Sequence, residues 1–354
     1  MNVKFWKDKR VFITGHTGFK GGWTVIWLQK MGAVIKGYAL TPGEGPSLYE
    51  VANIADGIES YIGDVRDLDT LSQAMLEFDP DIVIHMAAQP LVRASYSDPV
   101  GTYQINVMGT VNLLEAVRAC KSVKAVINVT TDKCYKNNEW IWGYRENEQM
   151  GGHDPYSNSK GCSELVTSAY RQSFFQSQTS SVSLASARAG NVIGGGDWSD
   201  DRLIPDVLKA FHLGKPVVIR NPLATRPWQH VLEPISGYLS LSEKLYNSEN
   251  EYAEGWNFGP NDEDAKSVSE VLEFLVAHWP SHASWSLDES SQPHEAQLLK
   301  LDISKAKARL KWAPRWDLNK AMQTIIDWHF AWVNGEEMKA FSLNQICDFE
   351  EASN

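Results

Sequence analysis

The chain has 354 residues, enough for one large α/β domain with an elaborated second lobe or for two domains sharing a cleft. Hydrophobic residues make up 43% and charged residues 22%, close to globular averages, which excludes a disordered or fibrous class, and a net charge of -11 argues against nucleic-acid binding. The start carries no signal-peptide apolar region and no apolar run approaches the roughly 20 residues of a membrane span, so we expect a cytoplasmic protein without a membrane partner.

Short apolar and β-branched runs alternate with longer helical patterns in the first half, which is typical of repeated βαβ units. The expected strands are residues 10–14, 33–38, 59–62, 81–85, 125–129 and 181–187. The expected helices cover about residues 20–31, 67–77, 98–120 and 155–176. Right-handed crossovers place such helices on both faces of a parallel sheet. The fold class we expect is therefore α/β, with a doubly wound parallel sheet.

The pattern changes after Arg188, where the sequence reads GNVIGGGDW and continues in shorter mixed elements. We expect residues 1–188 to form the sheet domain and residues 189–354 to form mainly a smaller mixed lobe for substrate. Segments near 231–259, a helix and then a strand, are candidates to return to the first domain. The last dozen residues, ending in DFEEASN, are expected to be a polar tail.

A glycine-rich loop, GHTGFKG, follows the first strand and leads directly into the helical stretch GWTVIWLQKMG. Glycines at such spacing let the backbone turn sharply and approach a pyrophosphate, while the helix N-terminus supplies N–H donors for the anion. The alternative is that they only mark a tight turn. The pattern predicts a Rossmann-type dinucleotide-binding domain, with contacts from the whole loop: Gly15, His16, Thr17, Gly18, Phe19, Lys20 and Gly21.

The second strand ends in ALTP, without the Asp or Glu that commonly accepts the adenosine ribose hydroxyls in NAD sites. NADP is the alternative cofactor, which a contact of His16 or Lys20 with a phosphate would favour. After the third strand, Asp64 is expected to hold the adenine amine. After the fourth strand, small residues would let backbone pass beneath the cofactor. The further candidate cofactor contacts in these two loops are Asp64, Val65, Ala87, Ala88 and Gln89.

The strongest chemical signal is Tyr156 with Lys160, preceded by Thr131 at the end of the fifth strand. Residues four apart share a helix face, so the two side chains are expected to be neighbours. A nearby ammonium lowers the pKa of a phenol, which makes Tyr156 a usable base, and Thr131 is placed to bind the same substrate oxygen. An ordinary surface helix is the alternative.

Together the glycine loop, Asp64, Ala87-Ala88, Asn106, Thr131 and the Tyr156/Lys160 pair resemble the extended short-chain dehydrogenase/reductase family over nearly the whole chain. The resemblance implies a Rossmann domain with a small substrate lobe and NAD as cofactor. It also implies a homodimer, or a dimer of dimers, formed through the helices near 98–120 and 155–176. The cofactor contacts it adds to the loops above are Asn106, Thr130, Tyr156 and Lys160.

Within that family, Thr131-Asp132-Lys133, GGGDW at 194–198 and TRPWQHVLEP at 225–234 resemble the CDP-glucose 4,6-dehydratases. The dehydratases that act on dTDP-glucose typically carry Asp-Glu where this chain has Asp-Lys. The resemblance implies conversion of CDP-glucose to CDP-4-keto-6-deoxyglucose, a step toward the deoxyhexoses and dideoxyhexoses of surface polysaccharide such as the O-antigen of lipopolysaccharide. Tyr156 would take the 4-hydroxyl proton, Asp132 would protonate the departing C6 oxygen, and Lys133 is the candidate base at C5.

The substrate diphosphate is an anion that a few arginines of the lobe would hold, since a planar guanidinium suits phosphate oxygens. The candidate substrate contacts are Asn191, Trp198, Arg202, Arg220, Arg226 and Asn257, with Arg188 as a further cation. Four scattered cysteines without zinc-ligand spacing indicate free thiols and no metal site. The alternatives are a 4-epimerase, a dehydratase of another nucleotide-glucose, and a catalytically silent dinucleotide-binding sensor or scaffold.

Overall fold

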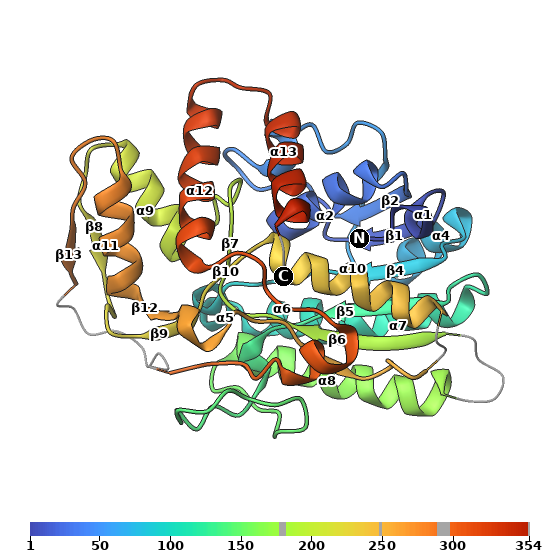
Figure 1. Ribbon diagram of the computed structural model, residues 1–354. Helices are drawn as coiled ribbons and strands as arrows, with labels where there is room; N and C mark the ends of the chain where they lie inside the picture. The colour runs from blue at the N-terminus through green and yellow to red at the C-terminus, as the bar shows by residue number, and fades with distance from the viewer. Residues whose placement is uncertain (177–181, 248–249, 289–297, 353–354) are drawn as a thin grey trace.

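The computed structural model describes residues 1–176, 182–247, 250–288 and 298–352 (Figure 1). Its main sheet has seven strands in the order β11-β6-β5-β4-β1-β2-β3, paired in parallel throughout. The strands are β1 Arg10–Thr14, β2 Val34–Ala39, β3 Glu59–Ile62, β4 Ile82–His85, β5 Ala125–Val129, β6 Ser183–Arg188 and β11 Gly255–Asn257. The expected α/β class with a doubly wound parallel sheet is confirmed. The expected start of the sixth strand, Ser181, lies outside the described residues.

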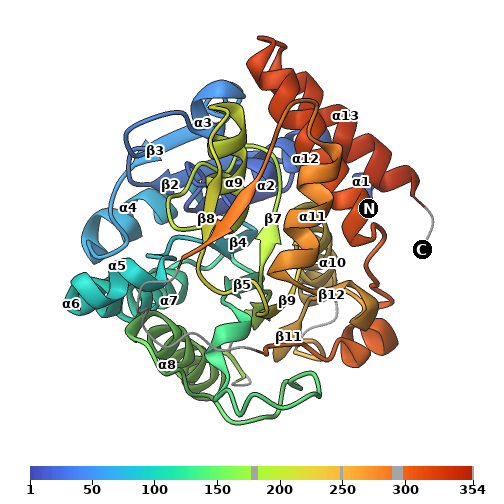
Figure 2. The same ribbon diagram turned by 90° about the vertical axis from the view of Figure 1, so that its left-hand side faces the viewer.

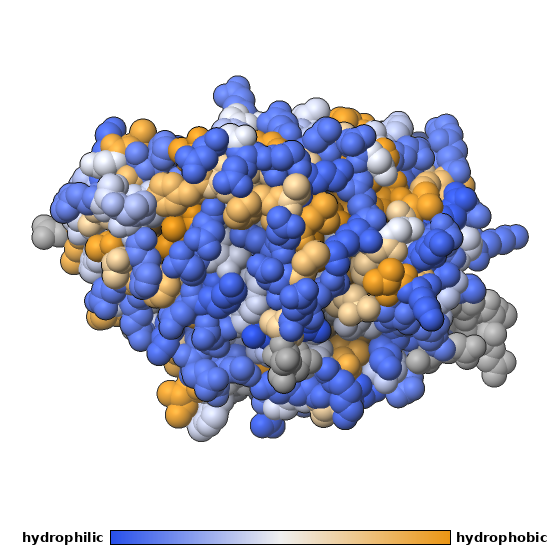
Figure 3. All heavy atoms as spheres, turned by 45° about the horizontal axis from the view of Figure 1, so that its top comes forward, coloured by the Kyte–Doolittle hydropathy of each residue, from blue (hydrophilic) through white to orange (hydrophobic). Residues whose placement is uncertain are grey.

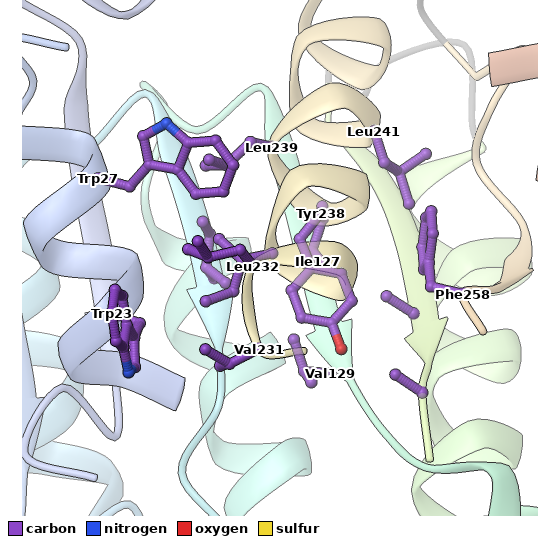
Figure 4. Close-up of a cluster of buried hydrophobic side chains, with 14 of the residues drawn as sticks. Trp23, Trp27, Ile127, Val129, Val231, Leu232, Tyr238, Leu239, Leu241 and Phe258 are labelled. Atoms are coloured by element: carbon purple, nitrogen blue, oxygen red, sulfur yellow. The ribbon is translucent and has the colours of Figure 1, made fainter. Parts of the chain in front are cut away.

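Helices cover both faces of this sheet because side chains alternate between the faces along each strand. Val11 and Ile13 of β1 belong to a hydrophobic cluster with α2 Phe19–Lys30 and α10 Leu232–Asn247. Figure 4 shows this layer, with Trp23 and Trp27 from α2 beside Leu232 from α10.

Phe12 points to the opposite face and packs in a second hydrophobic cluster with α4 Leu68–Phe78 and α7 Gly109–Ala119. Helix α8 Pro155–Tyr170 continues this second layer beside α7 (Figure 1). The short elements around these helices are α1 Val3–Trp6, α3 Leu48–Val51, α5 Val92–Ser97 and α6 Pro99–Tyr103.

The helix expected over residues 98–120 is interrupted in the structure. Helix α6 passes into a π-helical turn, η1 Gln104–Met108, before α7 begins. Such turns occur frequently at functional sites because they change the direction in which one side chain points. Asn106 lies within this turn and is buried. A similar π turn, η3 Arg171–Phe175, ends the helix that begins with α8.

Strand order reverses beside β1, which pairs with β2 on one side and with β4 on the other. In open parallel sheets, ligands bind beyond the carboxyl ends of the strands at this reversal. The glycine loop follows β1, Ala87 follows β4 and Thr131 follows β5, so all three loops lie at the same edge of the sheet. The topology therefore brings the predicted cofactor and catalytic segments together.

A smaller lobe lies to one side of the main sheet, and Figure 2 shows it facing the viewer. Its helices and strands contribute side chains to a separate hydrophobic cluster, which includes Ile204, Phe211, Val217 and Leu272. The lobe consists of α9 Leu203–His212, β8 Val217–Ile219, β9 Thr225–Pro227, β12 Ala265–Ser267, α11 Val268–His278 and β13 Trp285–Leu287. Between it and the main sheet lie β7 Val192–Ile193, β10 Gln229–His230 and α12 Leu318–Val333 (Figure 1).

The segments near 231–259 leave this lobe and join the first half of the chain. Helix α10 covers the sheet, and β11 pairs in parallel with β6 to become its edge strand. The Rossmann part of the structure is therefore assembled from two separate stretches of sequence.

The expectation of a polar tail over the last dozen residues is wrong. Residues 338–351 form α13 Met338–Glu351, which packs beside α2 (Figure 1). Phe349 lies edge-on to Trp27, and the Trp27 indole donates to Glu350 at 2.9 Å. The polar composition conceals an apolar stripe, Ile346 and Phe349, which is buried at helical spacing.

Hydrophilic residues cover most of the face shown in Figure 3, with hydrophobic residues interspersed. Across the described ranges, no helix is long and apolar enough to cross a membrane.

Candidate active site

A cavity of about 1190 Å³ opens at the carboxyl ends of the main strands and extends into the lobe. Pockets for one drug-sized ligand measure about 300–1,000 Å³, so this cavity has room for a dinucleotide and a second ligand together. It brings together most of the predicted site residues: Gly15, Thr17, Gly18, Phe19, Lys20, Gly21, Asp64, Val65, Ala87, Ala88, Thr130, Thr131, Asp132, Lys133, Tyr156, Lys160, Asn191, Arg202, Arg220 and Arg226.

The glycine loop has the geometry that a pyrophosphate site requires. Gly15 has a φ of +80°, and a Cβ there would lie 2.8 Å from the Ala87 nitrogen. A Cβ on Gly21 would lie 2.1 Å from the Gly15 carbonyl oxygen. Helix α2 begins at Gly18, where no side chain in the described parts of the chain caps the first turn. Its first-turn amides are therefore available to an anion in the cavity.

The adenosine end of the cavity differs from a typical NAD site. Strand β2 ends at Ala39 and Leu40, which line the cavity without a carboxylate. Both carboxylate oxygens of Asp64 accept hydrogen bonds from Arg66, from its backbone N–H at 2.9 Å and its Nε at 2.8 Å. This hydrogen bonding with Arg66 lowers the pKa of Asp64. Asp64 lines the cavity as expected, with its charge already paired.

The expectation that His16 contacts a phosphate is wrong. Its imidazole is buried under β2, where a Cβ on Gly37 would lie 2.3 Å from the ring. Nε2 hydrogen bonds with the hydroxyl of Ser60 at 2.7 Å, and the ring lies edge-on to Tyr49. Burial lowers the pKa of His16 to about 4, so the ring is neutral. His16 packs the loop against the sheet instead of facing the cavity.

Lys20 lines the cavity, and the charged groups that act on it include Lys160 and Asp132, two of the expected catalytic residues. Burial, together with the cations of Arg202 and Lys160, lowers the pKa of Lys20 to about 7, against the opposing effect of the Asp132 and Asp197 carboxylates. The glycine loop thus contributes an amine that titrates near neutral pH to the part of the cavity that holds Asp132 and Lys160.

Tyr156 and Lys160 occupy successive turns of α8. Asp154 caps the helix by accepting from the Ser157 N–H at 2.9 Å, which places Tyr156 in the first turn. The Lys160 ammonium donates to the Val129 carbonyl at 3.4 Å, at the end of β5. Both side chains are buried and line the cavity.

The pKa of Tyr156 is shifted in the direction opposite to the sequence-based expectation. Burial raises it to about 12, and hydrogen bonding with Thr131 counteracts this only in part. Burial also lowers the pKa of Lys160 to about 8, against the opposing effect of the Glu164 carboxylate. In both groups desolvation is the largest effect, because both side chains are enclosed.

Asp132 is buried, and one of its two carboxylate oxygens makes no hydrogen bond with the described residues. Its Oδ1 accepts from the Thr131 hydroxyl at 2.9 Å, whereas Oδ2 has no hydrogen-bond partner in the part of the chain that the structure describes. Oδ2 lies against Gly190, where a Cβ would be 1.9 Å away, so a larger residue there would displace the carboxylate. Lys133 lines the same wall of the cavity and is half-buried. Asp132 is 1% exposed, so it does not belong to an exposed ion pair in a surface turn.

Asn106 and Gln89 lie behind the cavity wall. The Asn106 amide accepts from the Gln89 N–H at 2.9 Å and donates to the Gln89 carbonyl at 3.0 Å and to the Ser159 hydroxyl at 2.9 Å. These bonds tie the loop after β4 to α8, between Tyr156 and Lys160. Both residues position the cavity wall and do not line it, which corrects the expectation of direct cofactor contacts.

The arginines of the lobe enter the cavity with acidic partners. Arg202 Nη1 donates to Asp197 Oδ2 at 2.8 Å, and the Asp197 side chain is 5% exposed. Arg220 lies 3.9 Å from the Asp201 carboxylate. Arg226, in β9, is buried and lines the cavity.

Two residues that the sequence interpretation did not select belong to this region. Arg93, in α5, lines the cavity and lies 3.2 Å from Asp201, so it reaches the lobe from the Rossmann side. Asp197, within GGGDW, positions Arg202. The GGGDW motif could have identified Asp197 from the sequence. For Arg93, the only indication in the sequence was its closeness to Ala87-Ala88.

Asn257 and Trp198 do not line the cavity, which corrects the expectation that they contact substrate. The fully buried Asn257 amide accepts from the Tyr135 hydroxyl at 2.7 Å and donates to the Tyr144 carbonyl at 2.7 Å. Trp198 packs edge-on to Trp328 and Trp332, at centroid distances of 5.7 and 5.1 Å.

Comparison with known proteins identifies the family. Residues 12–325 match the family model described as GDP-mannose 4,6 dehydratase. A CDP-glucose 4,6-dehydratase of Salmonella typhimurium is 56% identical over 356 aligned residues, which cover 100% of this chain and 99% of the relative. The chain belongs to the nucleotide-sugar 4,6-dehydratase family. A dTDP-glucose 4,6-dehydratase of this family from Xanthomonas campestris is 25% identical, covering 94% of this chain and 97% of its own.

Solved structures agree with this fold. The UDP-glucose 4-epimerase of Thermotoga maritima, with UDP-glucose, superposes with a TM-score of 0.78 at 20% identity, covering 92% of this chain and 99% of its own. The dTDP-glucose 4,6-dehydratase of Bacillus anthracis, in complex with NAD, gives a TM-score of 0.76 at 21% identity, covering 94% and 99%. The expected extended short-chain dehydrogenase/reductase architecture is confirmed.

Proposed function

We propose that this chain uses NAD to convert CDP-glucose to CDP-4-keto-6-deoxyglucose and water. The observation that carries the proposal is the grouping of Asp132 and Lys133 with Thr131, Tyr156 and Lys160 in one cavity. The 56% identity to a CDP-glucose 4,6-dehydratase over the whole chain supports the substrate. The free first-turn amides of α2 and the close approach at Gly15 and Gly21 support a dinucleotide.

The first step is oxidation at C4 of the glucose. NAD, when bound, supplies the acceptor for the C4 hydride and later the donor of the same hydride to C6. Tyr156 removes the 4-hydroxyl proton, with the Thr131 hydroxyl as hydrogen-bond partner of the same oxygen. The buried Lys160, one helical turn from Tyr156, is the proposed cation that stabilises the phenolate. The hydrogen bond with Thr131 and the charge of Arg202 also oppose the rise in the pKa of Tyr156 that burial causes.

The second step is elimination of water across C5 and C6. The 4-ketone acidifies the C5 proton, which Lys133 removes, while Asp132 protonates the departing C6 oxygen. The hydride taken from C4 is then transferred to C6, and a proton is returned to C5, so that water is the only group lost. The unpartnered Oδ2 of Asp132 supports its assignment as the acid. A 4-epimerase needs neither group because its hydride leaves and returns at C4.

Arg202 and Arg226 hold the diphosphate, and Asn191 binds the sugar phosphate or hydroxyls. The Asp197–Arg202 ion pair supports this role because it fixes the guanidinium at the cavity wall. Arginine forks match phosphate oxygens, so a few local cations suffice in a chain of net charge -11.

The active unit in this proposal is a cytoplasmic homodimer built on the face of α6, η1 and α8. Exposed apolar side chains on that face support it: Val100 is 66%, Met108 49% and Leu165 59% exposed. The four free cysteines support a reducing compartment.

A substrate panel tests the proposal. CDP-, dTDP-, GDP- and UDP-glucose are each incubated with the enzyme and with NAD or NADP, and the 4-keto-6-deoxy product is detected by its absorbance in alkali. We expect the highest rate with CDP-glucose and NAD. A product that does not absorb in alkali would indicate an epimerase, and a higher rate with another nucleotide would overturn the substrate. Tyr156→Phe serves as the control and is expected to reduce turnover by about 10²- to 10⁴-fold.

A further inference from the structure

The cavity continues past the catalytic residues into the lobe, where α9 and β8 form its far end. With the glucose C4 at Tyr156 and the diphosphate at Arg202 and Arg226, this end receives the nucleoside of the proposed substrate. Its walls are largely apolar and include Ile204, Val217 and Ile219, which suit the faces of a planar base. This placement rests on the proposed function.

A carboxylate without a basic partner lies at this far end. Asp206, in the first turn of α9, lines the cavity and is half-buried. Its side chain has no hydrogen bond and no ion pair within 4.0 Å among the described residues. By contrast, the neighbouring Asp197, Asp200 and Asp201 each pair with a basic side chain.

The surroundings of Asp206 also leave its charge poorly compensated. Burial and the carboxylates of Asp201 and Asp200 together raise the pKa of Asp206 to about 6, against the opposing effect of Arg220 and Lys209. A hydrogen-bond donor on a ligand would stabilise such a carboxylate, because a buried polar group without a partner is energetically costly.

We propose that Asp206 determines the base specificity of the enzyme by accepting a hydrogen bond from the exocyclic amine of cytosine. A carboxylate offers acceptors and no donor. Cytosine carries an amine donor at C4, whereas uracil and thymine carry a carbonyl acceptor there. The same carboxylate that binds cytosine therefore repels the carbonyl oxygen of the other two pyrimidines, because the ribose fixes the orientation of the ring.

The alternative role for Asp206 is structural, as an acidic residue that stabilises the start of α9 through the helix dipole. The two roles predict different results. A dipole interaction affects stability and not base preference. A hydrogen bond to the amine affects the ratio of affinities for cytosine and uracil nucleotides, by about 10- to 100-fold.

Calorimetric binding of CDP, UDP and dTDP to the enzyme tests the proposal without turnover. Wild type is expected to bind CDP at least about 10-fold more tightly than UDP or dTDP. Asp206→Asn, whose amide donates to a carbonyl oxygen, is expected to bring the three affinities within about threefold of one another. Asp206→Ala is expected to weaken CDP binding and to strengthen UDP binding, because it removes both the hydrogen bond to the amine and the repulsion of the carbonyl oxygen. Asp200→Asn is the matched control, since the Asp200 side chain is 85% exposed and outside the cavity.

The proposal is overturned if either Asp206 variant keeps the wild-type CDP to UDP ratio while melting like wild type. Failure of the proposed function gives a different result, because wild type would then fail to dehydrate CDP-glucose in the substrate panel. If wild type dehydrates CDP-glucose and the Asp206 variants still prefer CDP, the assignment of Asp206 alone is rejected.

Discussion

Glu164 and Arg188 form an ion pair in which Oε2 and Nη2 lie 2.7 Å apart, with side chains only 4% and 6% exposed. Glu164 also accepts from Ser186 at 2.6 Å and from Thr130, so α8, β5 and β6 are joined directly behind the catalytic residues. Arg188, considered from sequence as a cation for the diphosphate, is therefore part of the interior of the protein. Lys160 lies one helical turn before Glu164.

Glu164→Gln is expected to lower the free energy of unfolding by about 3–5 kcal/mol, because it leaves the Arg188 charge buried without compensation. Replacing both residues with apolar side chains, Glu164→Leu with Arg188→Met, is expected to destabilise less than the single variant. Urea denaturation measures both effects. A single variant as stable as wild type would contradict the prediction.

Lys133→Ala is expected to retain oxidation at C4 and to lose elimination. The reason is that the variant lacks the proposed C5 base while Tyr156 and Lys160 are unchanged. In deuterated water, mass spectrometry is expected to show deuterium incorporation at C5 slowed by about 10²- to 10⁴-fold, while the absorbance of reduced cofactor still appears after mixing. Incorporation at the wild-type rate would remove Lys133 from the mechanism.

Tyr238→Phe is expected to leave stability unchanged or to increase it by up to about 2 kcal/mol, because the removed hydroxyl is buried without a hydrogen bond among the described residues. The ring extends from α10 toward Val129 in Figure 4, and burial raises the pKa of Tyr238 well above its usual value. Thermal melting with a denaturant series measures the change.

Tyr135→Phe is the matched control for Tyr238→Phe. The Tyr135 hydroxyl donates to Asn257 and accepts from Arg188, each at 2.7 Å. Its loss is expected to cost about 1–3 kcal/mol. Equal changes in the free energy of unfolding for the two variants would contradict the prediction that a hydroxyl without hydrogen bonds contributes less to stability than one with two.

His230 makes stability depend on pH. Burial between Trp23 and Trp316 lowers the pKa of His230 from 6.5 to about 3, so the folded protein keeps the ring neutral while the unfolded chain takes up a proton below pH 6.5. This contribution to stability is fully present above pH 6.5 and decreases as the pH falls toward 3.

His230→Asn removes that dependence. Protonation of this group in the unfolded chain is expected to lower the free energy of unfolding of wild type by about 2 kcal/mol at pH 5, and the variant lacks this loss. The difference in free energy of unfolding between wild type and variant therefore decreases from pH 7.5 to pH 5. Denaturant midpoints at several pH values measure this. The exposed His282→Asn is the control. A difference in free energy of unfolding that stays constant with pH would contradict the prediction that the His230 ring stays neutral in the folded protein.

Much of the fold was predictable because its signals are local. The runs at 10–14 and 125–129 coincide with β1 and β5, since β-branched runs between turns specify strands without tertiary context. The glycine loop, Tyr156 and Lys160 were predictable for the same reason: their spacing alone sets their geometry. The helix over 98–120 was found, but its π turn at Asn106 was not, because that turn depends on contacts with Gln89 and Ser159.

Burial was the property that the sequence did not reveal. His16 and Asn257 carry side chains suited to ligands, yet partners distant in sequence, Ser60 and Tyr135, enclose them. The pKa of Tyr156 was predicted with the wrong sign because its neighbour Lys160 is visible in the sequence and its desolvation is not. Asp206 was missed because nothing in the sequence distinguishes it from the paired acidic residues around it.

The position of β11 at the edge of the sheet, beside β6, limits how the protein can be divided for experiments. Truncation after Arg188 would remove both this strand and α10, uncovering an unpaired strand edge and the apolar residues under the helix. Exposed edges of that kind promote aggregation. The cofactor-binding half is therefore not a separable fragment, and studies of dinucleotide binding require the lobe to be present in the same polypeptide.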